Sequence, residues 1–511
     1  MRYSDQSLPV GVVSAPLASI DADVIVVAAF EGEAPSLSGL DAATGGRLSA
    51  AFSAREFTGK AASLFITPCS APDWRPARLM LVGAGSRSRF DTAELRRAAT
   101  TAALAARERR WRRVAFALPG ALPPADEAQA AAEGLTLAAH YSGIYKSDAE
   151  ARPIAIESLI ALPERMEADA RASAERAAAR GYILAACSNL ARALVNEPAN
   201  VMTPRAFAEI ASQIAAESGL KVDVLDEDRL AGLEMGLLLG VARGSAERPR
   251  MVVLRYEPAR PATPAVLGLV GKGVTFDTGG ISIKPSDRMH LMKTDMSGGA
   301  AVVAAMKAIA ALKPDVTVVG VVPLVENMPG GRAMRPGDVV RSAEGKTVEV
   351  LDTDAEGRLI LADALWYARQ LGATHLVDVA TLTGAIGIAL GRSTTGLFGC
   401  PDAWVALVGR TANRAGDRAW ALPLFDDYRE QLRSDIADMA NIGGRPAGAI
   451  TAAVFLKEFT GGLPWAHLDI ASTAWSEEAQ PWQPKGPTGA AVRTLAELAC
   501  TYGEWPSPPP V

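Results

Sequence analysis

The chain has 511 residues, of which 49% are hydrophobic and 21% charged, and its formal net charge is -5 at neutral pH. A single hydrophobic core rarely grows beyond about 300 residues, so we expect more than one domain. The composition excludes an intrinsically disordered chain, and the small negative charge argues against a protein that coats nucleic acid.

The first 165 residues alternate between strand-like and helix-like segments. Apolar runs typical of buried strands lie at 24–29, 79–82 and 114–118, and an Ala-rich stretch with helical spacing lies at 92–110. This alternation predicts a smaller N-terminal α/β domain over residues 1–165. The following stretch is rich in Ala, Arg and Glu and predicts a connecting helix over 166–195.

The same alternation resumes after Pro198. Buried strands are predicted at 265–270, 316–324 and 375–379, and helices at 297–312 and 359–371. The pattern predicts a larger C-terminal α/β catalytic domain over 196–505, built on a mostly parallel central sheet. A Pro-rich tail at 506–511 is expected to fray.

The cysteines and the apolar runs bear on the cellular location. The four cysteines are scattered and form no CxxC pair, which favours a reducing compartment. Neither a signal peptide nor an uncharged apolar run of about 18 residues is apparent, so we expect no membrane span and a cytoplasmic location.

Several common catalytic motifs are absent. The four histidines form no HExxH, which excludes a zincin, and no GxSxG nucleophile elbow occurs. The segment 340–347 resembles a P-loop but has Val340 where the first glycine is required.

Two segments instead concentrate charged residues near predicted strand ends. The first carries Lys272 and Asp277 after a buried strand, and the second runs from 352 to 358 between a predicted strand and a helix. Ligands of open α/β sheets collect outside the carboxyl ends of the strands. Asp354 and Glu356 are two residues apart, so we predict an extended chain that points both side chains to one side.

Charge counting indicates a site for two metal ions. Asp277, Asp295, Asp354 and Glu356 supply four negative charges, which two divalent ions would neutralise. Oxygen ligands with few histidines suit Mg²⁺, Mn²⁺ or Zn²⁺, and such a pair can clamp a tetrahedral intermediate. Taken alone, Asp354 and Glu356 could form an ordinary turn with a helix cap, and a lone Lys272 could be a surface or phosphate-binding lysine.

The two segments resemble the signatures of the leucyl aminopeptidase (cytosol aminopeptidase) family. The family spelling Asn-Thr-Asp-Ala-Glu-Gly-Arg-Leu is matched at 352–359 with one change. Further matches follow one another along the chain at 196–200, 326–329, 335–338, 380–385, 441–445 and 465–471. The resemblance covers about residues 190–500, and the N-terminal domain is similar only loosely.

The resemblance implies five metal ligands, Lys272, Asp277, Asp295, Asp354 and Glu356, for two divalent ions (Mn²⁺ or Zn²⁺). Asp277 and Glu356 would bridge the ions. A lysine that ligates a metal must be neutral, and its deprotonation at pH 7 costs roughly 4.6 kcal/mol from a pKa near 10.4. Two adjacent dications and burial can supply that free energy.

The implied activity is metal-dependent hydrolysis of the N-terminal residue of peptides, with Leu-like or Met-like residues preferred, through a water activated by two metals. Lys284 would polarise the scissile carbonyl as an electrophile. Arg358 cannot act as a base because its pKa exceeds about 12, and it would anchor a bicarbonate that serves as general base. The family also implies a homohexamer.

The resemblance further implies the substrate-binding residues Met292, Asp352, Thr381, Gly384, Ala471 and Ala474. Two residues depart from the family pattern, because Asp352 replaces an Asn and Ser472 replaces a Gly. Both departures bear on substrate preference and metal affinity. The alternatives are a DNA-binding regulatory role and a metal-dependent esterase or dipeptidase that uses the same site.

Overall fold

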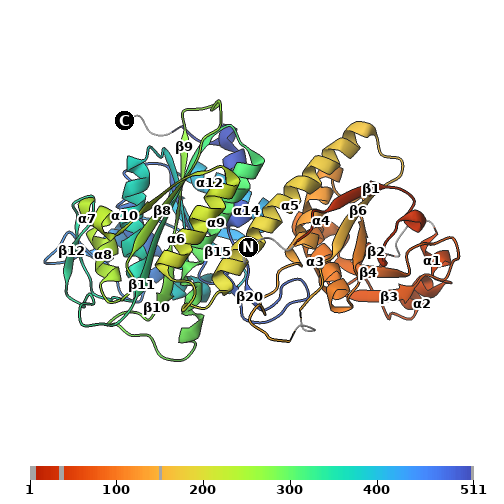
Figure 1. Ribbon diagram of the computed structural model, residues 1–511, viewed down its shortest axis with the longest axis horizontal. Coiled ribbons are helices and arrows are strands. Elements are labelled where there is room, and N and C mark those ends of the chain that lie inside the picture. The colour runs from red at the N-terminus through yellow and green to blue at the C-terminus, as the bar shows by residue number, and fades with distance from the viewer. Residues whose placement is uncertain (1–6, 34–38, 149–151, 508–511) are drawn as a thin grey trace. The chain divides into compact units, whose positions relative to one another are not determined.

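The computed structural model describes residues 7–33, 39–148 and 152–507, which form two compact units (Figure 1). The first unit contains residues up to Asn189 together with Ser476–Gly486, and the second contains Leu190–Trp475 and the chain from Pro487 onward. Most of the Pro-rich tail that we expect to fray, residues 508–511, lies outside the described residues, as do residues 1–6. Both units are α/β, which confirms the predicted fold class.

The first unit is built on a six-stranded sheet. Its strands, in spatial order, are β1 (Gly11–Ser14), β6 (Glu157–Leu162), β5 (Arg113–Ala117), β2 (Val24–Phe30), β4 (Arg78–Gly85) and β3 (Leu64–Pro68). All neighbours pair in parallel except β3 and β4. The helices are α1 (Leu40–Ala43), α2 (Arg47–Ser53), α3 (Thr92–Glu108) and α4 (Pro124–Leu137).

Strand β2 is buried along its whole length because helices cover both faces of this sheet. Val24 and Val26 belong to the hydrophobic cluster that contains α3 and α4, whereas Ile25 and Val27 belong to the cluster that contains α1 and α2. Alternation of side chains along a strand produces this division.

The second unit is built on a nine-stranded sheet. Eight strands follow the order β16 (Ala419–Ala421), β15 (Thr395–Cys400), β18 (Trp465–Asp469), β14 (His375–Ala380), β9 (Val266–Gly271), β11 (Thr317–Asn327), β8 (Arg250–Tyr256) and β7 (Lys221–Leu225), and β10 (Gly273–Asp277) also pairs with β11. The central pairs β18–β14–β9–β11 and β10–β11 are parallel, as predicted.

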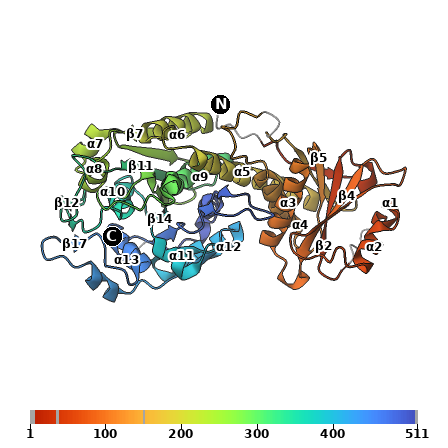
Figure 2. The same ribbon diagram turned by 90° about the horizontal axis from the view of Figure 1, so that it is seen from below.

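Helices cover both faces of this sheet (Figures 1 and 2). One layer contains α6 (Pro204–Ser218), α9 (Ser297–Leu312), α12 (Asp402–Ala415) and α14 (Val492–Cys500), and the other contains α8 (Gly236–Ala242), α10 (Glu356–Gln370) and α13 (Gly448–Lys457). The division again follows strand alternation, because Gly320 of β11 faces Val302 and Met306 of α9, whereas Val319 and Val321 belong to the cluster with α8 and α10.

The remaining elements are shorter, apart from the long helix α5. They are η1 (Leu17–Ser19), η2 (Arg87–Arg89), α5 (Ala168–Asn196), α7 (Glu227–Gly232), η3 (Met289–Met296), β12 (Val339–Arg341), β13 (Thr347–Glu349), α11 (Gly384–Leu390), η4 (Asp426–Leu432), β17 (Met439–Ala440), β19 (Trp475–Ser476), β20 (Gly486–Pro487) and η5 (Tyr502–Glu504). The helix predicted at 297–312 is confirmed as α9.

Among the described residues one helix, Met289–Leu312, is long and apolar enough to cross a membrane by length and composition. It consists of η3 and α9, and 78% of its most apolar window is buried inside the fold. α9 contacts β8, β9, β11 and β14, so its apolar surface is covered by the central sheet, as is typical of a core helix.

Candidate metal centre

The side chains predicted as metal ligands lie at the carboxyl edge of the nine-stranded sheet. Lys272 directly follows β9, and Asp277 is the last residue of β10. Asp295 lies in η3, Asp354 lies in the turn before α10, and Glu356 is the first residue of that helix. β9 and β10 run parallel to β11, β9 along Thr317–Val321 and β10 along Leu324–Asn327, so Lys272 and Asp277 both lie toward the carboxyl end of β11.

The prediction that Asp354 and Glu356 share one side of an extended chain is wrong. The chain turns at Thr353 and Asp354, and α10 begins at Glu356 rather than at residue 359. A carboxylate in the first turn interacts favourably with the helix dipole, which favours this earlier start. The side chains nevertheless converge, since ligand atoms of Asp277, Asp354 and Glu356 all lie within 4.8 Å of one another.

Lys272 pairs with two carboxylates of this cluster. Its Nζ lies 2.8 Å from Asp295 Oδ2 and 2.8 Å from Glu356 Oε1, and it donates to the carbonyl oxygen of Thr381 at 3.0 Å. Burial lowers the pKa of Lys272, but the negative charges of Asp295 and Glu356 outweigh burial and raise the pKa above its ordinary value. With these neighbours, the lysine is a buried cation.

Lys284 pairs with the two other carboxylates. Its Nζ lies 2.8 Å from Asp277 Oδ2 and 2.6 Å from Asp354 Oδ1. Burial again opposes the charge, and the negative charges, Asp277 first among them, raise the pKa of Lys284 above its ordinary value. The side chain is 22% exposed, against 4% for Lys272, so Lys284 lies on the open side of the cluster.

The four carboxylates carry more negative charge than Lys272 and Lys284 can neutralise. Burial, followed by the charge of Asp277, raises the pKa of Glu356 to about 8 and that of Asp354 to about 6. Burial also raises the pKa of Asp295. Asp295 Oδ2 and Asp354 Oδ1 are buried and make contacts with lysine but no well-oriented hydrogen bond. A buried set of oxygen donors with excess negative charge fits divalent cations.

Sequence reasoning missed two asparagines that support this cluster. Asn327 Nδ2 donates to Asp277 Oδ1 at 2.8 Å. Asn441 Nδ2 donates to the backbone carbonyl oxygen of Asp352 at 2.6 Å, and the backbone carbonyl oxygen of Asn441 accepts from Arg358 Nη1 at 2.7 Å. Both asparagines lie in segments that carry the family resemblance, but a neutral amide has no charge or spacing that would single it out.

Arg358 is 7% exposed and lies in the first turn of α10. Its Nε is buried without a hydrogen-bond partner, and no carboxylate in the described part of the chain forms an ion pair with it. Burial lowers the pKa of Arg358 to about 10, although Glu356 and Asp352 act in the opposite direction. A buried guanidinium with an unused donor is suited to bind an anion.

The loops that carry predicted substrate-binding residues are tied to the cluster. Thr381 Oγ1 donates to Asp295 Oδ1 at 2.7 Å. Asp469 Oδ1 accepts from the backbone N–H groups of Leu382 and Ala471, each at 3.2 Å, and so joins the loops that follow β14 and β18. Of the other predicted residues, Met292 lies on η3, Gly384 begins α11, and Ala474 is 4% exposed.

Asp352, the departure from the family pattern, acts structurally as a turn residue. Its Oδ1 accepts from the backbone N–H of Asp354 at 2.9 Å, a bond that the side-chain oxygen of Asn could also accept. The substitution therefore keeps the turn and adds a negative charge, which contributes to the raised pKa of Asp354.

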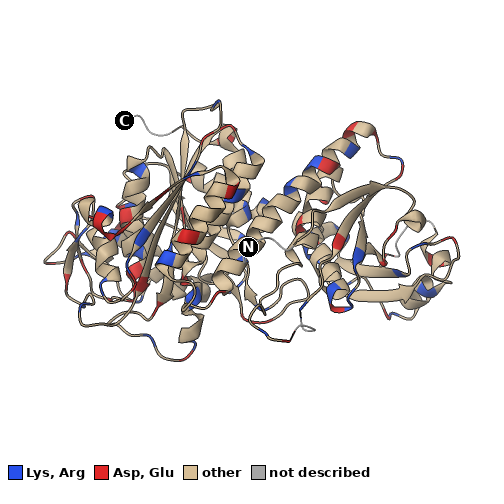
Figure 3. Ribbon diagram, in the orientation of Figure 1, with Lys and Arg blue, Asp and Glu red and all other residues tan. Residues whose placement is uncertain are grey.

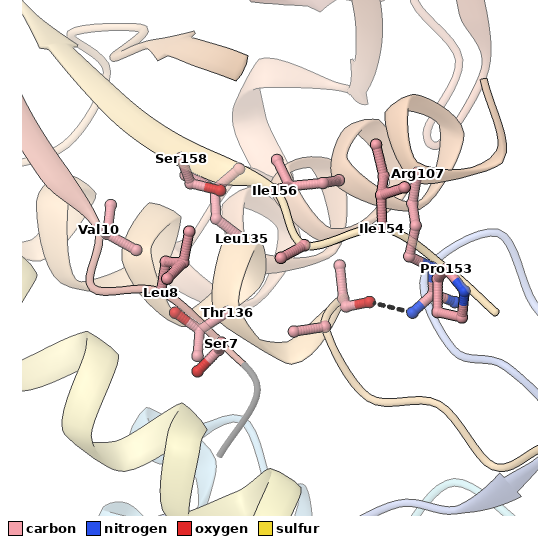
Figure 4. Close-up of a pocket in the computed structure, with 13 residues that line it drawn as sticks. Ser7, Leu8, Val10, Arg107, Leu135, Thr136, Pro153, Ile154, Ile156 and Ser158 are labelled. Atoms are coloured by element: carbon pink, nitrogen blue, oxygen red, sulfur yellow. Dashed lines mark hydrogen bonds between the residues drawn. The ribbon is translucent and has the colours of Figure 1, made fainter. Parts of the chain in front are cut away.

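A separate pocket lies in the first unit and contains none of the predicted site residues (Figure 4). Its lining is mainly apolar, with Leu8, Leu135 and Ile156 among the residues that form it. Arg107, which also lines the pocket, donates to the backbone carbonyl oxygens of Ala138 and His140, so its guanidinium is bound to the protein itself.

Comparison with known proteins places this geometry in a family. The model of the cytosol aminopeptidase family, catalytic domain, matches residues 189–496, and that of the family's N-terminal domain matches residues 26–149. The chain belongs to the cytosol aminopeptidase family. It is therefore an aminopeptidase, a hydrolase acting on peptides, and aminopeptidases of this family depend on metal ions.

Individual relatives agree with this assignment. This aminopeptidase is 50% identical over 487 residues to a probable cytosol aminopeptidase of Solibacter usitatus, covering 95% of this chain and 98% of the relative. Among solved structures it is similar to a mutant of tomato leucine aminopeptidase (TM-score 0.87, 35% identity, 97% of each chain). It is also similar to the bottromycin maturation enzyme BotP in complex with Mn (TM-score 0.82, 38% identity, 94% of this chain and 99% of the other).

Proposed function

We propose that this aminopeptidase is of the leucyl type and uses two divalent cations, Mn²⁺ or Zn²⁺, held by Lys272, Asp277, Asp295, Asp354 and Glu356. The observation that carries the proposal is the convergence of four carboxylates and a buried lysine at one sheet edge. The similar structure of BotP in complex with Mn supports a Mn²⁺ site.

Two divalent cations bound at these residues would acidify a water molecule for attack on the peptide carbonyl and would hold the free N-terminal amine of the substrate. To act as a ligand, Lys272 has to give up its proton. Asp295 and Glu356 hold this proton in the metal-free protein, but divalent cations at the same carboxylates would replace the ammonium charge and favour the neutral amine.

Lys284 stays protonated during the reaction. Its side chain is 22% exposed, so water can stabilise the ammonium charge when cations occupy the neighbouring carboxylates. We assign it as the electrophile, which donates a hydrogen bond to the scissile carbonyl oxygen and stabilises the negative charge that develops there.

Arg358 would hold a bicarbonate, which would supply a general base. The guanidinium is buried, its Nε lacks a partner, and Asn441 fixes Nη1 from behind, so an anion beside Nε would gain a charge-assisted hydrogen bond. A bicarbonate held there could accept the proton of the attacking water, a step that arginine itself cannot perform.

We assign the side chain of the substrate's N-terminal residue to a pocket of mostly small and apolar residues. Such a pocket favours substrates that begin with Leu or Met. The residues proposed to line it are Met292, Thr381, Gly384, Ala471 and Ala474, with Asp352 beside the substrate amine. The bond between Thr381 and Asp295 supports this assignment, because it links the pocket wall to the cluster.

A homohexamer in the cytoplasm completes the proposal, by analogy with the family. Acidic and basic residues are spread over both units (Figure 3). The arginine-rich stretch 107–113 also contains Glu108, and Arg113 pairs with Asp21 and Glu157. With a net charge of -5, this distribution gives no support to a DNA-binding role.

Leucyl substrates with free and blocked N-termini test the function. The purified enzyme should cleave leucyl-p-nitroanilide and leave the N-acetylated compound intact. Equal cleavage of the two compounds would contradict an aminopeptidase and favour the esterase alternative. Gel shifts at physiological salt test the DNA-binding alternative.

A further inference from the structure

Asn327 lies behind the carboxylate cluster, at the end of β11, and is 3% exposed. Its Nδ2 donates to Asp277 Oδ1 at 2.8 Å and to the carbonyl oxygen of Thr353 at 3.0 Å, with Glu356 Oε2 at 3.4 Å. All three neighbours are acceptors, so the amide nitrogen, and not the amide oxygen, has to face them.

This contact fixes the orientation of Asp277. Its Oδ1 accepts from Asn327 Nδ2 and also from the backbone N–H of Gly279 at 2.9 Å. Two donors on one oxygen hold the plane of the carboxylate. They leave Oδ2 turned toward the cluster, where it lies 2.8 Å from Lys284 Nζ.

Asn327 is itself held in place. The backbone N–H and the hydroxyl of Thr278 donate to the main-chain carbonyl oxygen of Asn327 at 2.9 and 2.8 Å, which fixes the backbone from which the side chain projects. Gly280 packs so closely on the amide that a Cβ there would lie 2.7 Å from Asn327 Oδ1. The close approach of Gly280 and the two bonds donated by Nδ2 restrict rotation of the side chain, so its position can be transmitted to the carboxylates that it contacts.

We propose that Asn327 is a positioning residue for the metal centre, whose amide sets the spacing between Asp277 and Glu356. The inference rests on the proposed two-metal function, in which these two carboxylates bridge the cations. Groups that donate hydrogen bonds to ligating carboxylates orient them, and losing one such group costs about 10–100-fold in metal affinity. Because Asn327 contacts both bridging ligands, its loss should weaken the binding of both cations together.

The test compares the wild-type enzyme with Asn327→Leu, which has a similar volume and no donor. Mn²⁺ affinity and stoichiometry are measured by competition with a chromophoric chelator, and folding of the metal-free proteins is measured by thermal unfolding. Thr494→Val is the matched control, since Thr494 is also fully buried and donates one hydrogen bond, to Asp417 Oδ2 at 2.8 Å, but belongs to α14 and not to the cluster. If Asn327→Leu does not fold, Asn327→Ser serves in its place, because its short hydroxyl leaves room for water.

The expected result is about 10–100-fold weaker binding of both Mn²⁺ ions, with the control within about twofold of wild type. At saturating Mn²⁺ the KM for a leucyl substrate should stay near the wild-type value, because Asn327 lies behind the carboxylates and not on the substrate side. Unchanged Mn²⁺ affinity in a folded variant, or the weakening of one ion alone, would overturn the inference. A wild-type enzyme that binds no Mn²⁺ and stays active after chelation would instead overturn the proposed function.

Discussion

Replacing Lys284 by methionine should have opposite effects on metal binding and on catalysis. The ammonium group lies 2.8 Å from Asp277 Oδ2 and 2.6 Å from Asp354 Oδ1, between two of the proposed ligands. A cation that binds these carboxylates has to displace it. Methionine is similar in length but uncharged, so the variant removes the competing cation together with the electrophile.

The magnitude follows from the contacts that Lys284 makes. A hydrogen bond to a charged group contributes about 1.5–3 kcal/mol. The side chain is 22% exposed, so solvent screens part of the interaction. We therefore take the free energy of one such hydrogen bond as the total for both contacts of Lys284. At 1.4 kcal/mol per tenfold change, Mn²⁺ should bind about 10–100-fold more tightly. The metal-free variant loses the same interaction and should unfold at a lower temperature.

Catalysis should change in the other direction, with kcat lower by about 10²–10³ at saturating Mn²⁺, as for the loss of an oxyanion donor. The assay titrates metal-free wild type and Lys284→Met with Mn²⁺ against a chelator and then measures kcat and KM with leucyl-p-nitroanilide. Lys457→Met is the control, because it removes a more exposed lysine of the same unit that pairs with Asp426 at 3.0 Å. A kcat within threefold of wild type would refute the assignment of Lys284 as the electrophile. Unchanged or weaker Mn²⁺ binding would refute the idea that the Lys284 ammonium competes with the metal.

Four further predictions concern the same centre. Dialysis against a chelator should abolish peptidase activity, and Mn²⁺ or Zn²⁺ should restore it; full activity after dialysis would contradict a two-metal mechanism. The pKa is raised to about 6 for Asp354 and to about 8 for Glu356, so their protonated forms stabilise the metal-free fold. This contribution is complete at a pH below the pKa values of the unfolded chain and is lost as the pH rises through the raised pKa values of the folded chain. Calorimetry should therefore show the unfolding temperature of the metal-free enzyme falling, and Mn²⁺ affinity rising, between about pH 5 and 8. Arg358→Ala should lower kcat by about 10²–10⁴ and remove any stimulation by added bicarbonate, whereas stimulation that persists would place the anion elsewhere. Gly280→Ala puts a Cβ at a φ of +67° and 2.7 Å from Asn327 Oδ1, so both the unfolding temperature and Mn²⁺ affinity should fall.

The family and the class of the fold could be predicted from the sequence because both depend on local patterns. Each buried parallel strand is a short apolar run, so β2, β9 and β14 are visible without any knowledge of their neighbours. The charged residues of the cluster are equally visible, since carboxylates and lysines beside strand ends are chemically conspicuous in any sequence.

Local patterns were less informative where the backbone changes direction. The start of α10 was predicted at residue 359, and Asp354 and Glu356 were expected in an extended chain. The charge of a glutamate in the first helical turn and the turn bond accepted by Asp352 decide the geometry. Both interactions are short-range, but periodicity of apolar residues contains no information about them.

The amino-acid sequence by itself determined which residues can carry chemistry and which family they resemble. Only the tertiary structure decided how those residues are paired and supported, namely that Lys272 joins Asp295 to Glu356 and that Asn327 stands behind Asp277. The physical reason is packing in space: the parallel register of β9, β10 and β11 places Lys272 and Asp277 near one end of the sheet, and the turn before α10 brings Glu356, 84 positions after Lys272, to the same end. A neutral amide acquires its role only from the groups that this register places around it.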